Sequence, residues 1–92
     1  MAELKFKKQA RLLKLLANPV RLEILAALSR QTICVRNLEE LVSRRQANIS
    51  QHLSILRHAG LIDFDRRGRK VCYFIVDKKT REVVRILERR LS

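Results

Sequence analysis

The sequence has few of the residues that build loops, aromatic clusters or disulfide frameworks. Its 92 residues include two glycines, one proline, two cysteines, four Phe or Tyr residues and no tryptophan. So little glycine and proline leaves little of the chain for linkers, which predicts a single domain over residues 1–92. Two cysteines are too few for a disulfide framework, and in a cytoplasmic protein they are expected as free thiols.

Long apolar runs are also missing. No stretch approaches the length of a membrane-spanning helix, and the first residues, MAELKFKKQ, are too polar for a signal peptide. We therefore expect a cytoplasmic protein. Catalytic patterns are absent too, because no acid lies beside a histidine with a plausible nucleophile and no glycine-rich phosphate loop occurs. We expect neither an enzyme nor a cofactor.

Acidic residues are scarce, with 9 Asp and Glu against 21 Lys and Arg, which gives a formal net charge of +12. Such an excess repels itself in a compact fold, so it indicates a polyanionic partner. Double-stranded DNA is the first candidate. A membrane surface is second, but no predicted helix combines a basic face with bulky aromatic residues, so no membrane partner is expected.

What the chain does contain is an unusual helical pattern over residues 46–58. Ile49, Leu53 and Leu56 share one stripe, with His52 at its edge. The opposite side carries small side chains and amides, and amides can bond bidentately to base edges in a major groove. We interpret this segment as a DNA recognition helix, the alternative being an ordinary surface helix. The candidate DNA contacts are Arg44 and Arg45 before the first turn, and Gln46, Asn48 and Gln51 for base reading.

The remaining patterns predict a helix-turn-helix followed by a hairpin. Helices are predicted over residues 4–17, 19–29, 36–43 and 78–91, a short strand over 31–35, and a β hairpin within 61–76. Asn18 with Pro19, Asn37 and Asp77 are the expected helix starts. The fold class is therefore mostly α with a small antiparallel hairpin, a winged helix-turn-helix of order α-α-β-α-α-β-β-α.

The hairpin, residues 62–75, is called the wing from here on. With Arg67-Gly68 as its turn, Ile62 faces Tyr73 and Phe64 faces Val71. Four cations then project from the tip and are expected to contact DNA beside the recognition helix, although a solvated turn is the alternative. They are Arg66, Arg67, Arg69 and Lys70.

Both terminal helices carry more apolar surface than a core of this size can cover. Leftover apolar patches usually mark an interface. We therefore expect a homodimer joined by residues 4–17 and 78–91. A two-fold dimer places two recognition helices about one DNA turn, ~34 Å, apart.

Three phrases give the chain a resemblance to the ArsR family of winged helix-turn-helix repressors. They are LANPVRLEILAAL (16–28), ISQHLSILRHAGL (49–61) and RRGRKVCYFI (66–75), in the family's order and spacing. The resemblance implies a homodimeric repressor of a pseudo-palindromic operator. It also supports Ser50 as a base contact more than helical spacing does.

The two cysteines raise the question of an inducer. Arsenite-sensing relatives hold two cysteines one residue apart, followed by an acid, where this chain reads Cys34-Val35-Arg36-Asn37. One thiol with a neighbouring cation is a poor soft-metal site, and the last helix lacks the histidines of zinc-sensing relatives. We expect no metal site, with a metal-responsive or metalloid-responsive repressor kept as an alternative.

In winged helices the short strand pairs with the hairpin, which would bring Cys34 near Cys72. An oxidised pair would then alter the wing and the affinity for DNA, which makes Cys34 and Cys72 candidate redox residues. The alternative is that both are small apolar side chains filling the sheet. Two rival functions also stay open, a sequence-tolerant DNA-coating protein and a winged helix that binds an acidic protein.

Overall fold

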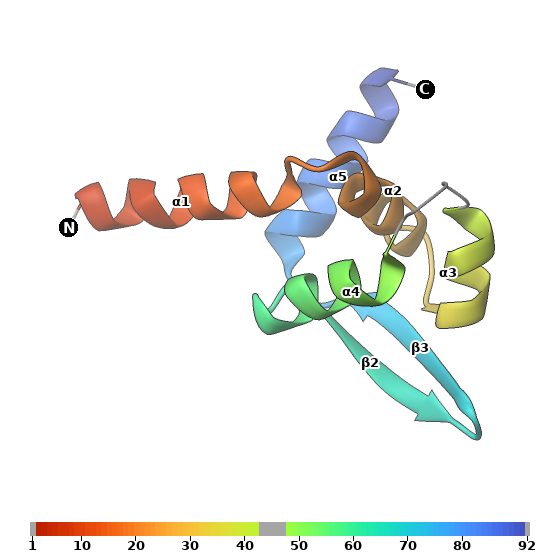
Figure 1. Ribbon diagram of the computed structural model, residues 1–92. Helices are drawn as coiled ribbons and strands as arrows, with labels where there is room; N and C mark the ends of the chain where they lie inside the picture. Colours follow the sequence, from red (N-terminus) through yellow and green to blue (C-terminus); the bar gives the residue numbers. More distant parts are fainter. Residues whose placement is uncertain (1, 43–47, 92) are drawn as a thin grey trace.

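The elements follow one another in the predicted order (Figure 1). The computed structural model describes residues 2–42 and 48–91, with side chains through Arg89. The helices are α1 (Ala2–Leu16), α2 (Pro19–Leu28), α3 (Val35–Leu41), α4 (Ile49–His58) and α5 (Lys78–Leu91). The strands are β1 (Ile33–Cys34), β2 (Ile62–Arg67) and β3 (Lys70–Ile75). The predicted fold class, mostly helical with a small antiparallel sheet, is confirmed.

Two of the three predicted helix starts are confirmed by their capping hydrogen bonds. The Asn18 side chain accepts from the backbone N–H groups of Val20 and Arg21 at 2.9 and 3.0 Å, and Pro19 opens α2. Asp77 accepts from the backbone of Thr80 at 2.9 Å at the start of α5.

The predicted cap at Asn37 is wrong. Helix α3 begins at Val35, and its N-cap is Cys34, which makes no side-chain capping bond. The physical reason is that the chain turns directly from the paired strand β1 into the helix, so Asn37 already lies within its first turn.

The sheet has the order β1-β3-β2, and both pairs are antiparallel. The hairpin loop is Gly68-Arg69, because Arg67 pairs with Lys70. The loop therefore lies one residue later than the predicted Arg67-Gly68 turn. Gly68 has φ +68°, and a two-residue hairpin loop needs this positive angle at its first position. As a result Ile62 faces Ile75 and Phe64 faces Tyr73, and the predicted pairing is wrong by two residues although the inward residues are unchanged.

Helix α2 lies at the centre of the core, as predicted. Its Ile24, Leu25 and Leu28 are almost completely buried, together with Leu38 of α3 and Val84 of α5. Leu53 and Leu56 of α4 are equally buried. Because this apolar stripe of α4 faces the core, the opposite side of the helix faces outward.

Helix α1 extends away from the rest of the molecule (Figure 1). Its residues from Ala2 to Arg11 are all exposed, and only Leu16 near its end is buried. Large apolar side chains are exposed on α1 and α5, namely Leu4, Phe6, Leu13, Ile86 and Leu87. Within residues 2–42 and 48–91, no helix combines the length and apolar character needed to cross a bilayer.

Candidate nucleic-acid interface

The start of α4 is organised by Asn48. Its side-chain oxygen accepts from the backbone N–H of Gln51 at 3.0 Å, so Asn48 is the N-cap of α4, which begins at Ile49. The predicted start near Gln46 lies outside the described residues. The Asn48 amide also donates to the side-chain oxygen of Gln51 at 3.2 Å. Asn48 was predicted only as a base contact, and its capping role was missed, although Asn directly before an apolar helical stripe is a signal for a cap.

The outward side of α4 carries the predicted polar residues. Asn48, Ser50 and Gln51 are exposed, and so are Ser54 and His58 one and two turns later. The His58 ring is held against the helix by a 2.8 Å contact between its Nδ1 and the backbone oxygen of Ser54. Arg44, Arg45 and Gln46 lie outside the described residues.

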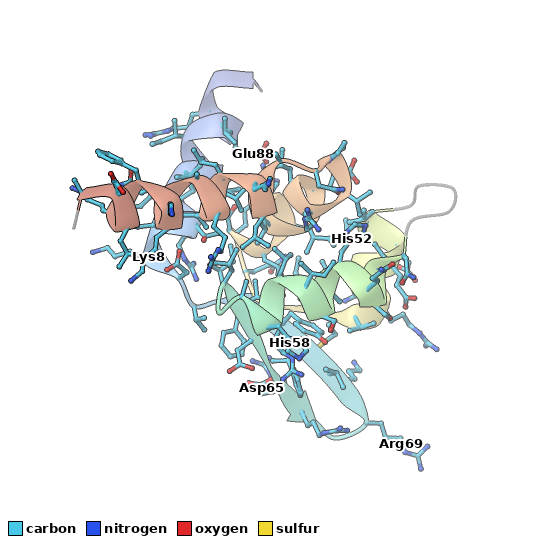
Figure 2. The ribbon with its side chains drawn as sticks, turned by 60° about the vertical axis from the view of Figure 1, so that its left-hand side comes forward. Lys8, His52, His58, Asp65, Arg69 and Glu88 are labelled. Carbon is cyan, nitrogen blue, oxygen red and sulfur yellow. A yellow bond between two sulfur atoms is a disulfide. The ribbon has the colours of Figure 1, made fainter. Side chains whose placement is uncertain are left out.

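The wing presents its cations at the far end of the hairpin. Arg66, Arg67, Arg69 and Lys70 are all exposed, and Figure 2 shows the Arg69 side chain pointing away from the body of the molecule. Arg67 forms an ion pair with Asp65 at 3.3 Å. Because both partners are well exposed, this pair is weak and leaves Arg67 able to exchange it for a phosphate.

A contact that the sequence did not reveal joins α4 to the wing. The Arg57 guanidinium lies over the Phe64 ring at 5.0 Å from its centroid, and Phe64 lies 5.5 Å from the Tyr73 ring. The chain leaves α4 through Gly60, which has φ +81° and donates to the Arg57 oxygen at 2.9 Å. The tight turn and the stacked arginine together hold α4 and the wing in a defined relative orientation.

The two cysteines lie on adjacent strands. Cys34 is directly opposite Cys72 in the β1–β3 pair, and the two sulfurs form a disulfide. The predicted proximity of the pair is therefore confirmed, whereas the expectation of two free thiols is wrong for this structure. The Cys72 side chain is fully buried and Cys34 is half-buried.

Metal-ligating side chains do not gather in the part of the chain that is described. Among those residues there is no group of three or more His, Cys, Asp or Glu side chains placed to hold an ion.

His52 is half-buried between α4 and α2. Its Nδ1 is buried and has no hydrogen-bond partner among the described residues. Arg21 of α2 lies nearby and is anchored by donating from Nε to the backbone oxygen of Leu15 at 2.7 Å. Burial of the ring and, to a smaller extent, the charge of Arg21 hold the pKa of His52 below its ordinary value of 6.5.

This shift predicts a loss of stability in mild acid. The unfolded chain takes up the His52 proton first as the pH falls, so the free energy of unfolding decreases from pH 6.5 down to the folded-state pKa. Urea titrations at pH 7.5 and 5.5 should show a smaller decrease for His52→Met than for the wild-type chain. His58→Gln, which changes an exposed histidine, serves as the control. Identical pH dependence in all three proteins would contradict the prediction.

Comparisons with known proteins agree on one family. Residues 18–63 match the family model described as bacterial regulatory protein, arsR family. The chain is 32% identical over 85 residues to an HTH-type transcriptional regulator of Methanocaldococcus jannaschii, covering 91% of the chain and 96% of that relative. It is 38% identical over 73 residues to the transcriptional repressor SmtB of Mycobacterium tuberculosis, covering 79% of the chain and 54% of that protein.

Among solved structures, reduced HlyU of Vibrio cholerae has a TM-score of 0.91 at 30% identity, covering 98% of this chain and 95% of that one. The fold is therefore shared over nearly the whole length of both chains.

Proposed function

Since the chain belongs to the arsR family of bacterial regulatory proteins, which regulate transcription by binding DNA, we propose that it is a homodimeric repressor of a pseudo-palindromic operator. The observation that carries this proposal is the outward side of α4, which bears amides and hydroxyls and no acid, beside the basic end of the wing. Because a transcriptional regulator works where the DNA is, the proposed compartment is the cytoplasm.

In the proposed complex α4 enters the major groove. Gln51, Asn48 and Ser50 read base edges, together with Gln46, while Arg44 and Arg45 contact phosphates or a guanine edge. The Asn48 cap uses its oxygen within the helix, which leaves the amide nitrogen of Gln51 as the donor best placed for a base. The wing cations Arg66, Arg67, Arg69 and Lys70 grip the flanking backbone.

Loss of a wing cation is expected to weaken binding to all DNA sequences alike. Arg69→Ala removes a charge at the exposed tip, so the slope of log K against log salt should become shallower by about one unit. Fluorescence anisotropy with operator and random duplexes between 50 and 300 mM KCl measures both slopes. Arg30→Ala changes an exposed arginine that pairs with Glu88 of α5, outside the wing, and should leave the slopes unchanged. A loss confined to the operator duplex would contradict a backbone role for the wing.

The terminal helices are the proposed dimer interface. The sequence predicted this interface over residues 4–17 and 78–91. Phe6 and Leu13 of α1 are 61% and 59% exposed, and Ile86 and Leu87 of α5 are also exposed. Apolar surface left uncovered on two helices is typical of an interface with a second copy. On this proposal the chain is one DNA-binding domain whose two ends serve dimerisation.

We further propose that the Cys34–Cys72 pair makes the repressor responsive to thiol oxidation. The disulfide connects β1 to the wing strand β3, and Cys34 is also the residue from which α3 begins. Forming or breaking this bond therefore acts on the wing and on the first helix of the helix-turn-helix together.

Oxidation is expected to change operator affinity by at least about fivefold. The reason is that a cross-link between the start of α3 and the wing alters the orientation of the wing relative to the helix-turn-helix that carries α4, and couplings of this kind typically change affinity about 5-fold or more. Anisotropy titrations with fully reduced and fully oxidised protein, verified by mass spectrometry, measure the change. Cys34→Ser should give the same affinity under both conditions. Equal affinities for the two forms of the wild-type protein would remove the thiol response and leave DNA binding intact.

A further inference from the structure

A cleft lies beside the Cys34–Cys72 disulfide. It has a volume of about 800 Å³ and lies between the first turn of α3 and the outer end of β3. Three cations line it, Arg36 from α3 and Arg69 and Lys70 from the wing, against the single acid Glu39. Cys34 forms part of its wall, together with Val71 and Tyr73 of β3.

The two sulfurs differ in their access to this cleft. The Cys72 side chain has no exposed area and is not part of the cleft, whereas Cys34 is half-buried and lines it. Thiol–disulfide exchange requires a thiolate to reach a sulfur directly. A dissolved partner entering the cleft would therefore react with Cys34, and Cys72, directly opposite in the strand pair, would complete the exchange.

The charge of the cleft selects the kind of partner. Three guanidinium or ammonium groups against one carboxylate favour an anion as the bound partner. Arg36 distinguishes the cleft from the basic wing tip, because it comes from α3 and still lines the cleft together with Arg69 and Lys70. A small neutral oxidant would gain nothing from this arrangement.

We propose that the cleft binds a low-molecular-weight disulfide that carries carboxylates, and that this ligand oxidises the reduced protein. The proposal rests on the thiol response proposed above and names its oxidant class. Carboxylates of the ligand pair with Arg36, Arg69 and Lys70, and its carbon chain lies along Val71 and Tyr73.

The exchange proceeds in two balanced steps. The Cys34 thiol gives its proton to water, and the thiolate attacks one ligand sulfur, so that a Cys34–ligand bond forms and the ligand S–S bond breaks. The released half leaves as a thiolate and takes up a proton. Cys72, deprotonated in turn, attacks the Cys34 sulfur and expels the second half as a thiol. Two protein thiols are oxidised to one disulfide, and one external disulfide is reduced to two thiols.

The test compares disulfides of different charge on the reduced full-length protein without DNA. Glutathione disulfide is the anionic probe, bis(2-hydroxyethyl) disulfide the neutral one and cystamine the cationic one. Acid quenching, alkylation and mass spectrometry give the rate of Cys34–Cys72 bond formation, normalised to the rate with a small model thiol. We expect glutathione disulfide to react about tenfold faster than the neutral probe, and cystamine to be slowest. In 1 M KCl the advantage should disappear.

Two variants test whether the cleft causes the faster reaction with the anionic disulfide. Arg36→Gln should lower the rate with glutathione disulfide at least threefold without changing the rate with the neutral probe. Arg30→Gln removes an exposed arginine outside the cleft and should change neither rate. Equal normalised rates for the anionic and neutral probes, or an Arg36→Gln effect on both, would overturn the cleft proposal and leave the thiol response standing. Failure of every probe to form the Cys34–Cys72 bond would overturn both, whereas operator binding, measured separately, would stand.

Discussion

Phe6→Glu combined with Leu13→Glu is expected to convert the protein into a folded monomer with at least about 100-fold lower operator affinity. The two residues are seven positions apart and so share one side of α1, where they are 61% and 59% exposed. In a dimer this apolar surface would be buried twice, once from each copy. Glutamates there would have to be buried unpaired or would keep the copies apart. One operator half-site then offers too few contacts to a single chain.

Light scattering after size exclusion measures the mass, and anisotropy measures the affinity. Lys8→Gln with Arg11→Gln is the matched control, because it also lowers the net charge by two but on the opposite side of α1. It should remain dimeric. Circular dichroism should show unchanged helix content in both double variants, since all four positions are exposed. A mutant that stays dimeric at micromolar concentration would place the interface elsewhere.

Gln51→Ala is expected to lower affinity for the operator and leave affinity for random DNA unchanged. Gln51 is exposed on the outward side of α4, and its side-chain oxygen is held by the Asn48 amide at 3.2 Å. This bond orients the free amide nitrogen of Gln51 before DNA arrives. Losing one such base contact typically costs ~1–3 kcal/mol, which corresponds to about 5-fold to 150-fold weaker operator binding.

Competition titrations with operator and random duplexes test this expectation. Gln31→Ala changes an exposed glutamine before β1 and should bind both duplexes as the wild-type protein does. The capping bond from the Gln51 backbone to Asn48 is retained in Gln51→Ala, so unfolding midpoints should match. Equal losses on the two duplexes would count against base reading by Gln51.

Features with local causes could be predicted from the sequence. Asn18 and Asp77 are helix starts because their side chains accept hydrogen bonds from backbone N–H groups two or three positions later, and Pro19 fits the first helical position. The apolar stripe of α4 predicted which side of the helix faces the core, because helical spacing is also visible in the sequence. The Cys34–Cys72 proximity followed from the expected pairing of the short strand with the hairpin.

Features that depend on a choice between similar local arrangements were missed. Two hairpin registers bury the same side chains of the wing, and the position of Gly68 in the turn decides between them. Asn48 has a side chain suited both to capping and to base reading, and the hydrogen bond to Gln51 reveals the first role. The Arg57–Phe64 contact depends on how the chain turns at Gly60.

The central claim is that a dimer presents the polar side of α4 and the wing cations to a specific operator. Selection of genomic fragments by the purified protein at 150 mM salt, followed by sequencing and competition against bulk DNA, tests it most directly. We expect an enriched inverted repeat whose half-sites are about 10 base pairs apart, and the complete repeat should bind about 10³-fold more tightly than random DNA. Uniform recovery of fragments with no enriched repeat would contradict it and indicate a DNA-coating protein.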